Sequence, residues 1–185
     1  MSKQFETSRQ VQVASAPTFR YATLADAERL AELATISFHQ AFDGSSKQEN
    51  VDGYVNSAFN SAQLRIELTD PKSTYVFAEV DGEAIGYLNL YEGEAPECVS
   101  EPPAIELSRL YVRQEFWAQK IGAALMQRAL EEAQQKGYRT IFLGVWEHNE
   151  RAKAFYRKWG FHRVGDHIFQ MGDDPQTDWW MERKL

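Results

Sequence analysis

Residues 104–161 contain the side chains whose types and spacing could do chemistry. The run A-I-E-L-S-R-L-Y-V is typical of a strand, and W-A-Q-K-I-G follows it just before an apolar stripe of helical period. A helix that begins directly after a strand presents unpaired backbone N–H groups and the positive end of its dipole. The pattern therefore predicts a binding site for a phosphate group at this turn.

A second helix is predicted from the run N-E-R-A-K-A-F-Y-R-K-W-G-F, which follows a buried strand at Thr140–Trp146. Asn149 is a good N-cap for that helix, and Gly160 is placed to end it. Tyr156 lies about two helical turns after Asn149, so both side chains project from one side of the helix. A phenol, whose pKa is about 10, can donate a proton to a leaving group within hydrogen-bond reach.

This order of elements resembles the acyl-CoA-binding core of the GNAT superfamily of N-acetyltransferases. The second helix matches the superfamily's N-x-x-A-x-x-hydrophobic-Y-x-x-x-G-F run at Asn149, Ala152, Phe155, Tyr156, Gly160 and Phe161. The turn departs from the superfamily's Gln/Arg-x-x-Gly-x-Gly/Ala pattern, since Trp117 and Lys120 stand at the first two marked positions and only Gly122 matches. Lys120 takes a positive φ less readily than glycine, but it would supply a positive charge.

The resemblance implies direct transfer of an acetyl group from acetyl-CoA to an amine, with no metal. By this match, Tyr156 protonates the departing thiolate, and Glu106 on the strand is the best-placed base. The pantetheine arm would bind along the backbone of the strand, and Asn149 could reach one of its amides. The expected cofactor-binding residues are Leu110, Tyr111, Val112, Trp117, Ala118, Gln119, Lys120, Ile121, Gly122, Ala123, Asn149, Ala152 and Tyr156.

The remaining patterns predict a single α/β domain at 18–185 after a flexible extension at 1–17. The resemblance implies a mixed, largely antiparallel central sheet of about six to seven strands with helices on both faces. An apolar stripe of helical period lies between 30 and 42, one or two short helices are expected within 44–70, and 92–103 reads as a loop. The further strands are expected at 19–21, at 74–80 and 84–90 around an Asp81-Gly82 turn, and at 161–169 and 179–184 around a loop at 172–175.

Composition limits the classes of function. The 185 residues are 43% hydrophobic and 25% charged, as in a globular domain, and the formal net charge of −7 disfavours nucleic acid and favours a cationic acceptor. Cys98 is the only cysteine, so an intrachain disulfide is excluded and a structural zinc site is disfavoured. His162 and His167 are expected on opposite faces of a strand. With neither a secretory signal nor a membrane-spanning apolar run, a cytoplasmic enzyme without a membrane partner is expected.

The carboxyl-terminal segment carries the run H-x-F-x-x-G-x-[DE]-x-Q-T-D…M, at His167, Phe169, Gly172, Asp174, Gln176, Thr177, Asp178 and Met181. This run is similar to the end of bacterial polyamine (spermidine/spermine) N-acetyltransferases, and it favours a small polycationic amine as acceptor. For most of these residues the favoured interpretation is a structural hairpin turn. Two other functions stay open: a protein or peptide N-acetyltransferase and a non-catalytic acyl-CoA-binding module. A homodimer is one assembly that the resemblance allows.

Overall fold

The computed structural model describes residues 16–42, 44 and 46–185. Apart from Ala16 and Pro17, the predicted extension at 1–17 lies outside them. Within these residues the strands are β1 (Thr18–Tyr21), β2 (Ser73–Val80), β3 (Glu83–Tyr91), β4 (Ala104–Val112), β5 (Thr140–Trp146), β6 (His162–Met171) and β7 (Asp174–Lys184). The α-helices are α1 (Ala27–Phe42), α2 (Gln48–Ala58), α3 (Ser61–Thr69), α4 (Ile121–Gln135) and α5 (Glu150–Lys158). None of these helices is long and apolar enough to cross a membrane.

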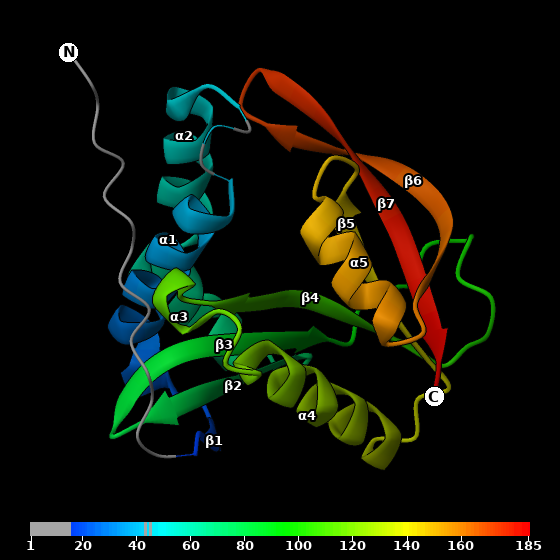
Figure 1. The fold of residues 1–185 in the computed structure, drawn as a ribbon, viewed down its shortest axis with the longest axis horizontal. Coiled ribbons are helices and arrows are strands. Elements are labelled where there is room, and N and C mark those ends of the chain that lie inside the picture. The colour runs from blue at the N-terminus through cyan, green and yellow to red at the C-terminus, as the bar shows by residue number, and fades with distance from the viewer. Residues whose placement is uncertain (1–15, 43, 45) are drawn as a thin grey trace.

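The strands form one sheet in the order β1-β2-β3-β4-β5-β7-β6. Neighbouring strands are antiparallel except β4 and β5, which are parallel. Helices α1–α3 cover one face and α4 and α5 the other, each layer with its own hydrophobic core (Figure 1). The expected mixed, largely antiparallel sheet with helices on both faces is confirmed.

The sheet opens at its centre because β4 and β5 pair only over three residues. The last parallel pair is Glu106 with Phe142, and the two strands then diverge. In an antiparallel pair, every second residue directs its backbone N–H and carbonyl toward the neighbouring strand. Arg113 is such a residue, because its N–H donates to the Ile85 carbonyl on β3 at 2.9 Å. Leu110 and Val112 lie at the alternate positions, so their backbone groups point away from β3. The divergence therefore leaves an edge of β4 without a strand partner, facing the space between the two halves of the sheet.

Local signals predicted the first hairpin correctly. Asp81 has φ 51° and Gly82 has φ 81°, which is the pair of positive φ values that a two-residue type I′ turn requires. The two short helices expected within 44–70 are also confirmed, as α2 and α3.

The loop predicted at 172–175 is wrong. Only Gly172 and Asp173 connect β6 to β7, and Pro175 pairs with Gln170 inside the strand. A proline is tolerated there because β5 pairs with β7 only from Asp178 onward, so the missing N–H breaks no bond on the β5 side.

The prediction that His162 and His167 point to opposite faces is also wrong. The register of β6 against β7 shifts between Arg163 and Gly165, which marks a β-bulge. Because a bulge adds one residue to one strand, it reverses the alternation of side chains beyond it. His162 consequently lies beside Glu182 and His167 stacks on Trp180, two residues that share one face of β7.

Candidate active site

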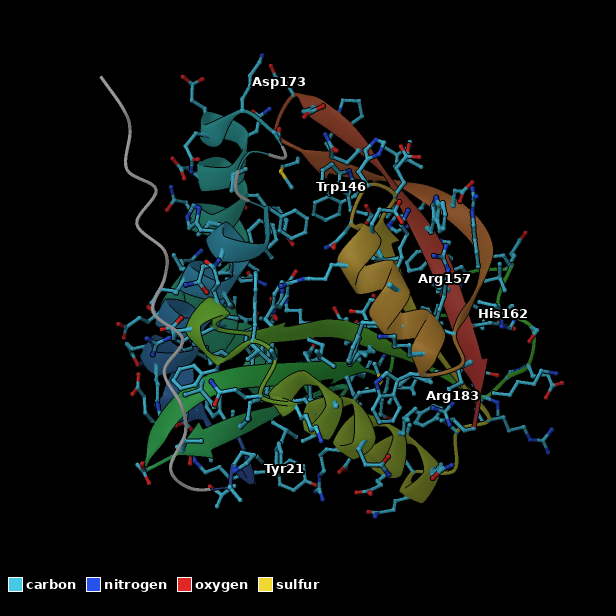
Figure 2. All side chains as sticks on the ribbon, in the orientation of Figure 1. Tyr21, Trp146, Arg157, His162, Asp173 and Arg183 are labelled. Carbon is cyan, nitrogen blue, oxygen red and sulfur yellow. The ribbon has the colours of Figure 1, made fainter. Side chains whose placement is uncertain are left out.

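A cavity of about 700 Å³ opens where β4 and β5 diverge. One side is formed by the end of β4, the turn before α4, and α5, and the other by α1, α2 and β5–β7. Figure 2 shows Trp146 in the space between α1 and α2 on one side and α5 on the other. The predicted site residues that line the cavity are Glu106, Leu110, Tyr111, Val112, Trp117, Ala118, Lys120, Ile121, Gly122, Ala123, Asn149, Ala152 and Tyr156. Gln119 is not among the lining residues, and its side-chain amide donates to the Glu115 carbonyl at 3.3 Å.

The turn before α4 keeps a left-handed backbone although it lacks the expected glycine. Ala118 has φ 65° and Lys120 has φ 64°, a conformation that costs a residue with a Cβ atom about 1–2 kcal/mol. Trp117, the other departure from the pattern, donates its indole N–H to the Val112 carbonyl at 2.8 Å. Trp117 therefore fastens the turn to the end of β4, and this bond helps to hold the strained backbone.

Lys120→Gly is expected to raise the free energy of unfolding by about 1 kcal/mol, because glycine adopts a positive φ without the Cβ penalty. Lys120→Ala is the matched control, since it removes the same charge but keeps the Cβ atom. Urea unfolding of the three proteins measures the difference. Equal stability of the glycine and alanine variants would show that the turn stores no such strain.

The predicted phosphate site falls on the first residues of α4, whose backbone N–H groups are free of helical bonds. Ala124 N–H donates to the Lys120 carbonyl at 3.0 Å, so the N–H groups of Ile121, Gly122 and Ala123 precede the first turn of helical bonds. A Cβ atom on Gly122 would meet only Val112 Cγ2 at 3.9 Å and Phe155 Cζ at 4.0 Å, which are ordinary contacts. The protein itself therefore has room for a side chain at this position, and the open space suits close approach of a phosphate to the backbone.

Arg151 adds a cation that the sequence patterns did not indicate. It follows Asn149 in the first turn of α5, and its guanidinium lies 3.4 Å from the centroid of the Trp117 ring. Burial lowers the pKa of Arg151. Among the described residues neither Arg151 nor Lys120 forms an ion pair, although both line the cavity. Their charges are thus available to an anionic ligand beside the helix terminus.

Helix α5 presents the predicted acid. The Asn149 side chain accepts from Ala152 N–H at 3.0 Å, so the N-cap prediction is confirmed, and Gly160 ends the helix with φ 84°. Tyr156 lines the cavity, and burial raises the pKa of its hydroxyl to about 12. The hydroxyl consequently keeps its proton at neutral pH, as a proton donor must.

Glu106 is the predicted base, and it lies at the point where β4 and β5 part. Burial raises the pKa of its carboxyl, while Arg109 opposes the shift. Arg109 is itself bonded to Glu67, with 2.6 Å between Nη1 and Oε2. A raised pKa makes a carboxylate a better proton acceptor near neutral pH. Among the described residues no group of three or more His, Cys, Asp or Glu side chains could hold a metal ion.

The side of the cavity away from the turn is aromatic and acidic. Its aromatic lining residues include Phe42, Tyr54, Trp146, Phe169 and Trp180. Asp178 also lines it, and burial, together with the nearby Glu147, raises the pKa of Asp178 to about 6.

Some residues of the carboxyl-terminal run have structural roles, and others line the cavity. Gly172 forms the turn, Asp174 accepts from Ser46 Oγ at 2.6 Å, and Met181 is buried in the core. The members that line the cavity are His167, Phe169, Gln176 and Asp178. The hairpin-turn interpretation does not account for these four residues. The run itself was the sequence signal that could have placed them in the site.

Comparison with known proteins agrees with this geometry. The profile described as the Acetyltransferase (GNAT) family matches residues 28–161. An uncharacterized N-acetyltransferase of Lactobacillus delbrueckii subsp. lactis is 34% identical over 149 residues, which cover 80% of this chain and 86% of that protein. A spermidine N(1)-acetyltransferase of Thermoplasma acidophilum is 25% identical over 169 residues, which cover 89% of this chain and 95% of that protein. The solved PaiA N-acetyltransferase of Thermoplasma acidophilum, in complex with coenzyme A, shares the fold with a TM-score of 0.73 at 23% identity, covering 92% of this chain and 100% of that one.

Proposed function

This chain belongs to the GNAT family of N-acetyltransferases, and we propose that its acceptor is a small polycationic amine such as a polyamine. The observation that carries the proposal is the composition of the cavity. Cations and free N–H groups gather on the side of the α4 turn, whereas carboxylates and aromatic rings gather on the other side. The first side suits the phosphates of acetyl-CoA, and the second suits a cation.

On the cofactor side, the N–H groups of Ile121, Gly122 and Ala123 bind the pyrophosphate of acetyl-CoA in this proposal. Arg151 and Lys120 supply positive charge beside them. The unpaired edge of β4 near Leu110 supplies the backbone groups that hold the pantetheine arm in the manner of an added strand. This arrangement directs the thioester toward Tyr156 and Glu106.

In the proposed reaction, Glu106 takes a proton from the acceptor ammonium, directly or through water. The neutral amine then attacks the thioester carbonyl, a C–N bond forms, and the C–S bond breaks. The departing thiolate takes the proton of the Tyr156 hydroxyl. The attacking nitrogen loses its extra proton as the amide forms, and this proton restores the Tyr156 hydroxyl directly or through water, while Glu106 releases its proton to solvent. Buried groups with suitably placed pKa values are typical of such general acid–base catalysis.

Two observations favour a polycationic acceptor over a neutral one. The acceptor side of the cavity holds Glu106 and Asp178, and the aromatic rings beside them attract cations. The net charge of −7 adds a field that favours positively charged molecules. The resemblance to the Thermoplasma spermidine N(1)-acetyltransferase supports the same class. Competition between free spermidine and lysine-containing peptides at equal concentration tests the assignment, and preferential acetylation of the peptides would overturn it.

Gly122→Val tests the cofactor site. Acetyl-CoA is expected to raise the melting temperature of the wild-type protein, because a ligand that binds only the folded state stabilises it. The variant should melt close to the wild type without ligand, since a Cβ atom at Gly122 makes only ordinary contacts. The increase in its melting temperature on addition of acetyl-CoA should be nearly lost, because the new side chain occupies the space of the phosphate. An equal ligand-induced shift in both proteins would place the cofactor elsewhere.

A further inference from the structure

Gly144 opens a hollow in the wall of the cavity. It is the exposed position of β5, whose neighbouring residues Leu143 and Val145 are buried. A Cβ atom at Gly144 would lie 3.1 Å from His167 Cε1, 3.4 Å from Trp180 Cζ3 and 3.7 Å from Asp178 Oδ2. Side chains from β6 and β7 therefore converge on this one glycine, and even a Cβ atom would take up the hollow and press on the His167 ring.

Asp178 brings an uncompensated negative charge to the hollow. Among the described residues its carboxylate has neither a hydrogen bond nor an ion pair, and the residue is half-buried. The neighbouring Glu147 has the same sign of charge and adds to the shift of its pKa. His167 offers no compensating charge, because burial lowers its pKa while its ring stacks on Trp180 with 3.9 Å between the centroids. Even partial burial of a carboxylate without a cation is costly, and a cationic ligand would relieve that cost.

Two arginines that line the cavity are engaged with other residues. Arg109 is bonded to Glu67, and Arg151 stacks on Trp117 beside the α4 turn. Two tryptophans are neighbours of Asp178 in the sheet instead, since Trp146 on β5 pairs with Asp178 and Trp180 lies across from Gly144 in the β5–β7 register. A carboxylate near aromatic rings has the composition of a site for an ammonium group.

We propose that Asp178, over the hollow at Gly144, binds the second, non-reacting ammonium of a diamine acceptor while the first amine is held at Glu106. This inference rests on the proposed function. It makes charge at both ends of the acceptor a requirement for efficient transfer, so that a monoamine of the same length is a poor substrate.

The test compares 1,4-diaminobutane with 1-aminobutane for the wild type, Asp178→Asn and Gly144→Ala. The wild-type kcat/KM should be about 10- to 100-fold higher for the diamine. In both variants the kcat/KM for the diamine should fall close to that for the monoamine. Asp178→Asn removes the charge, and Gly144→Ala fills the hollow. Asp166→Asn is the matched control, because Asp166 pairs with Arg163 on the surface of β6. This variant should have the wild-type kcat/KM for both substrates.

Calorimetric binding of both amines to the CoA-bound enzyme separates the inference from the function on which it rests. A diamine preference in binding that is lost in Asp178→Asn supports the subsite even if neither amine is acetylated, which would refute only the proposed function. Acetylation of both amines by the wild type with equal kcat/KM would leave the function standing and overturn the subsite. An equal fold loss for both amines in Asp178→Asn would also overturn it.

Discussion

Tyr156→Phe is expected to lower kcat by about 10²- to 10⁴-fold, the usual contribution of a positioned proton donor. The hydroxyl lines the cavity, and its pKa of about 12 keeps it protonated across the neutral range. Without it, the thiolate must leave unprotonated or take its proton from water. The aromatic ring remains, so the packing of Tyr156 against Phe155 and Phe161 changes little.

Three measurements on the same preparation make this result interpretable. The Kd for acetyl-CoA and the melting temperature of Tyr156→Phe should stay near the wild-type values while kcat falls. Asn149→Ala provides the contrast, because loss of its 3.0 Å capping bond should cost about 1 kcal/mol of stability. Turnover by Tyr156→Phe at the wild-type rate would remove Tyr156 as the acid and leave the cofactor site unaffected.

Glu106→Gln is expected to produce the second large loss, also about 10²-fold or more in kcat. Burial raises the pKa of Glu106, and the carboxyl accepts a proton only when it is ionised. Wild-type activity should therefore rise as the pH increases through the pKa of Glu106, and this acidic limb should disappear in the glutamine variant. Glu94→Gln, an exposed substitution in the loop after β3, is the charge-matched control. An unchanged pH profile in Glu106→Gln would assign the base to another group.

Sequence reasoning succeeded where short-range chemistry decides the structure. Asp81-Gly82 permits the positive φ values of a tight turn, and Asn149 carries the oxygen that caps α5. These signals depend on one residue and its near neighbours, so a single chain is enough to predict them. The same holds for the α4 turn, although there Lys120 adopts a conformation that its residue type disfavours.

The wrong predictions for β6 and β7 involve contacts between strands. The bulge between Arg163 and Gly165 placed His162 and His167 on one face, and the position of Pro175 beyond the end of the β5–β7 pairing allowed β7 to begin early. Neither is visible in a pattern of alternating residues. The hollow at Gly144 requires three strands in register, so its constituents become apparent only in the folded sheet.

We propose that this enzyme transfers the acetyl group of acetyl-CoA to a polyamine nitrogen. The most direct measurement incubates the protein with acetyl-CoA and spermidine and follows both the released CoA thiol and the N-acetylated amine by mass spectrometry. We expect equal amounts of the two products in the wild type and a large drop of both in Tyr156→Phe. Binding of acetyl-CoA without acetylation of any polyamine, or thiol release no faster than in the absence of protein, would contradict it.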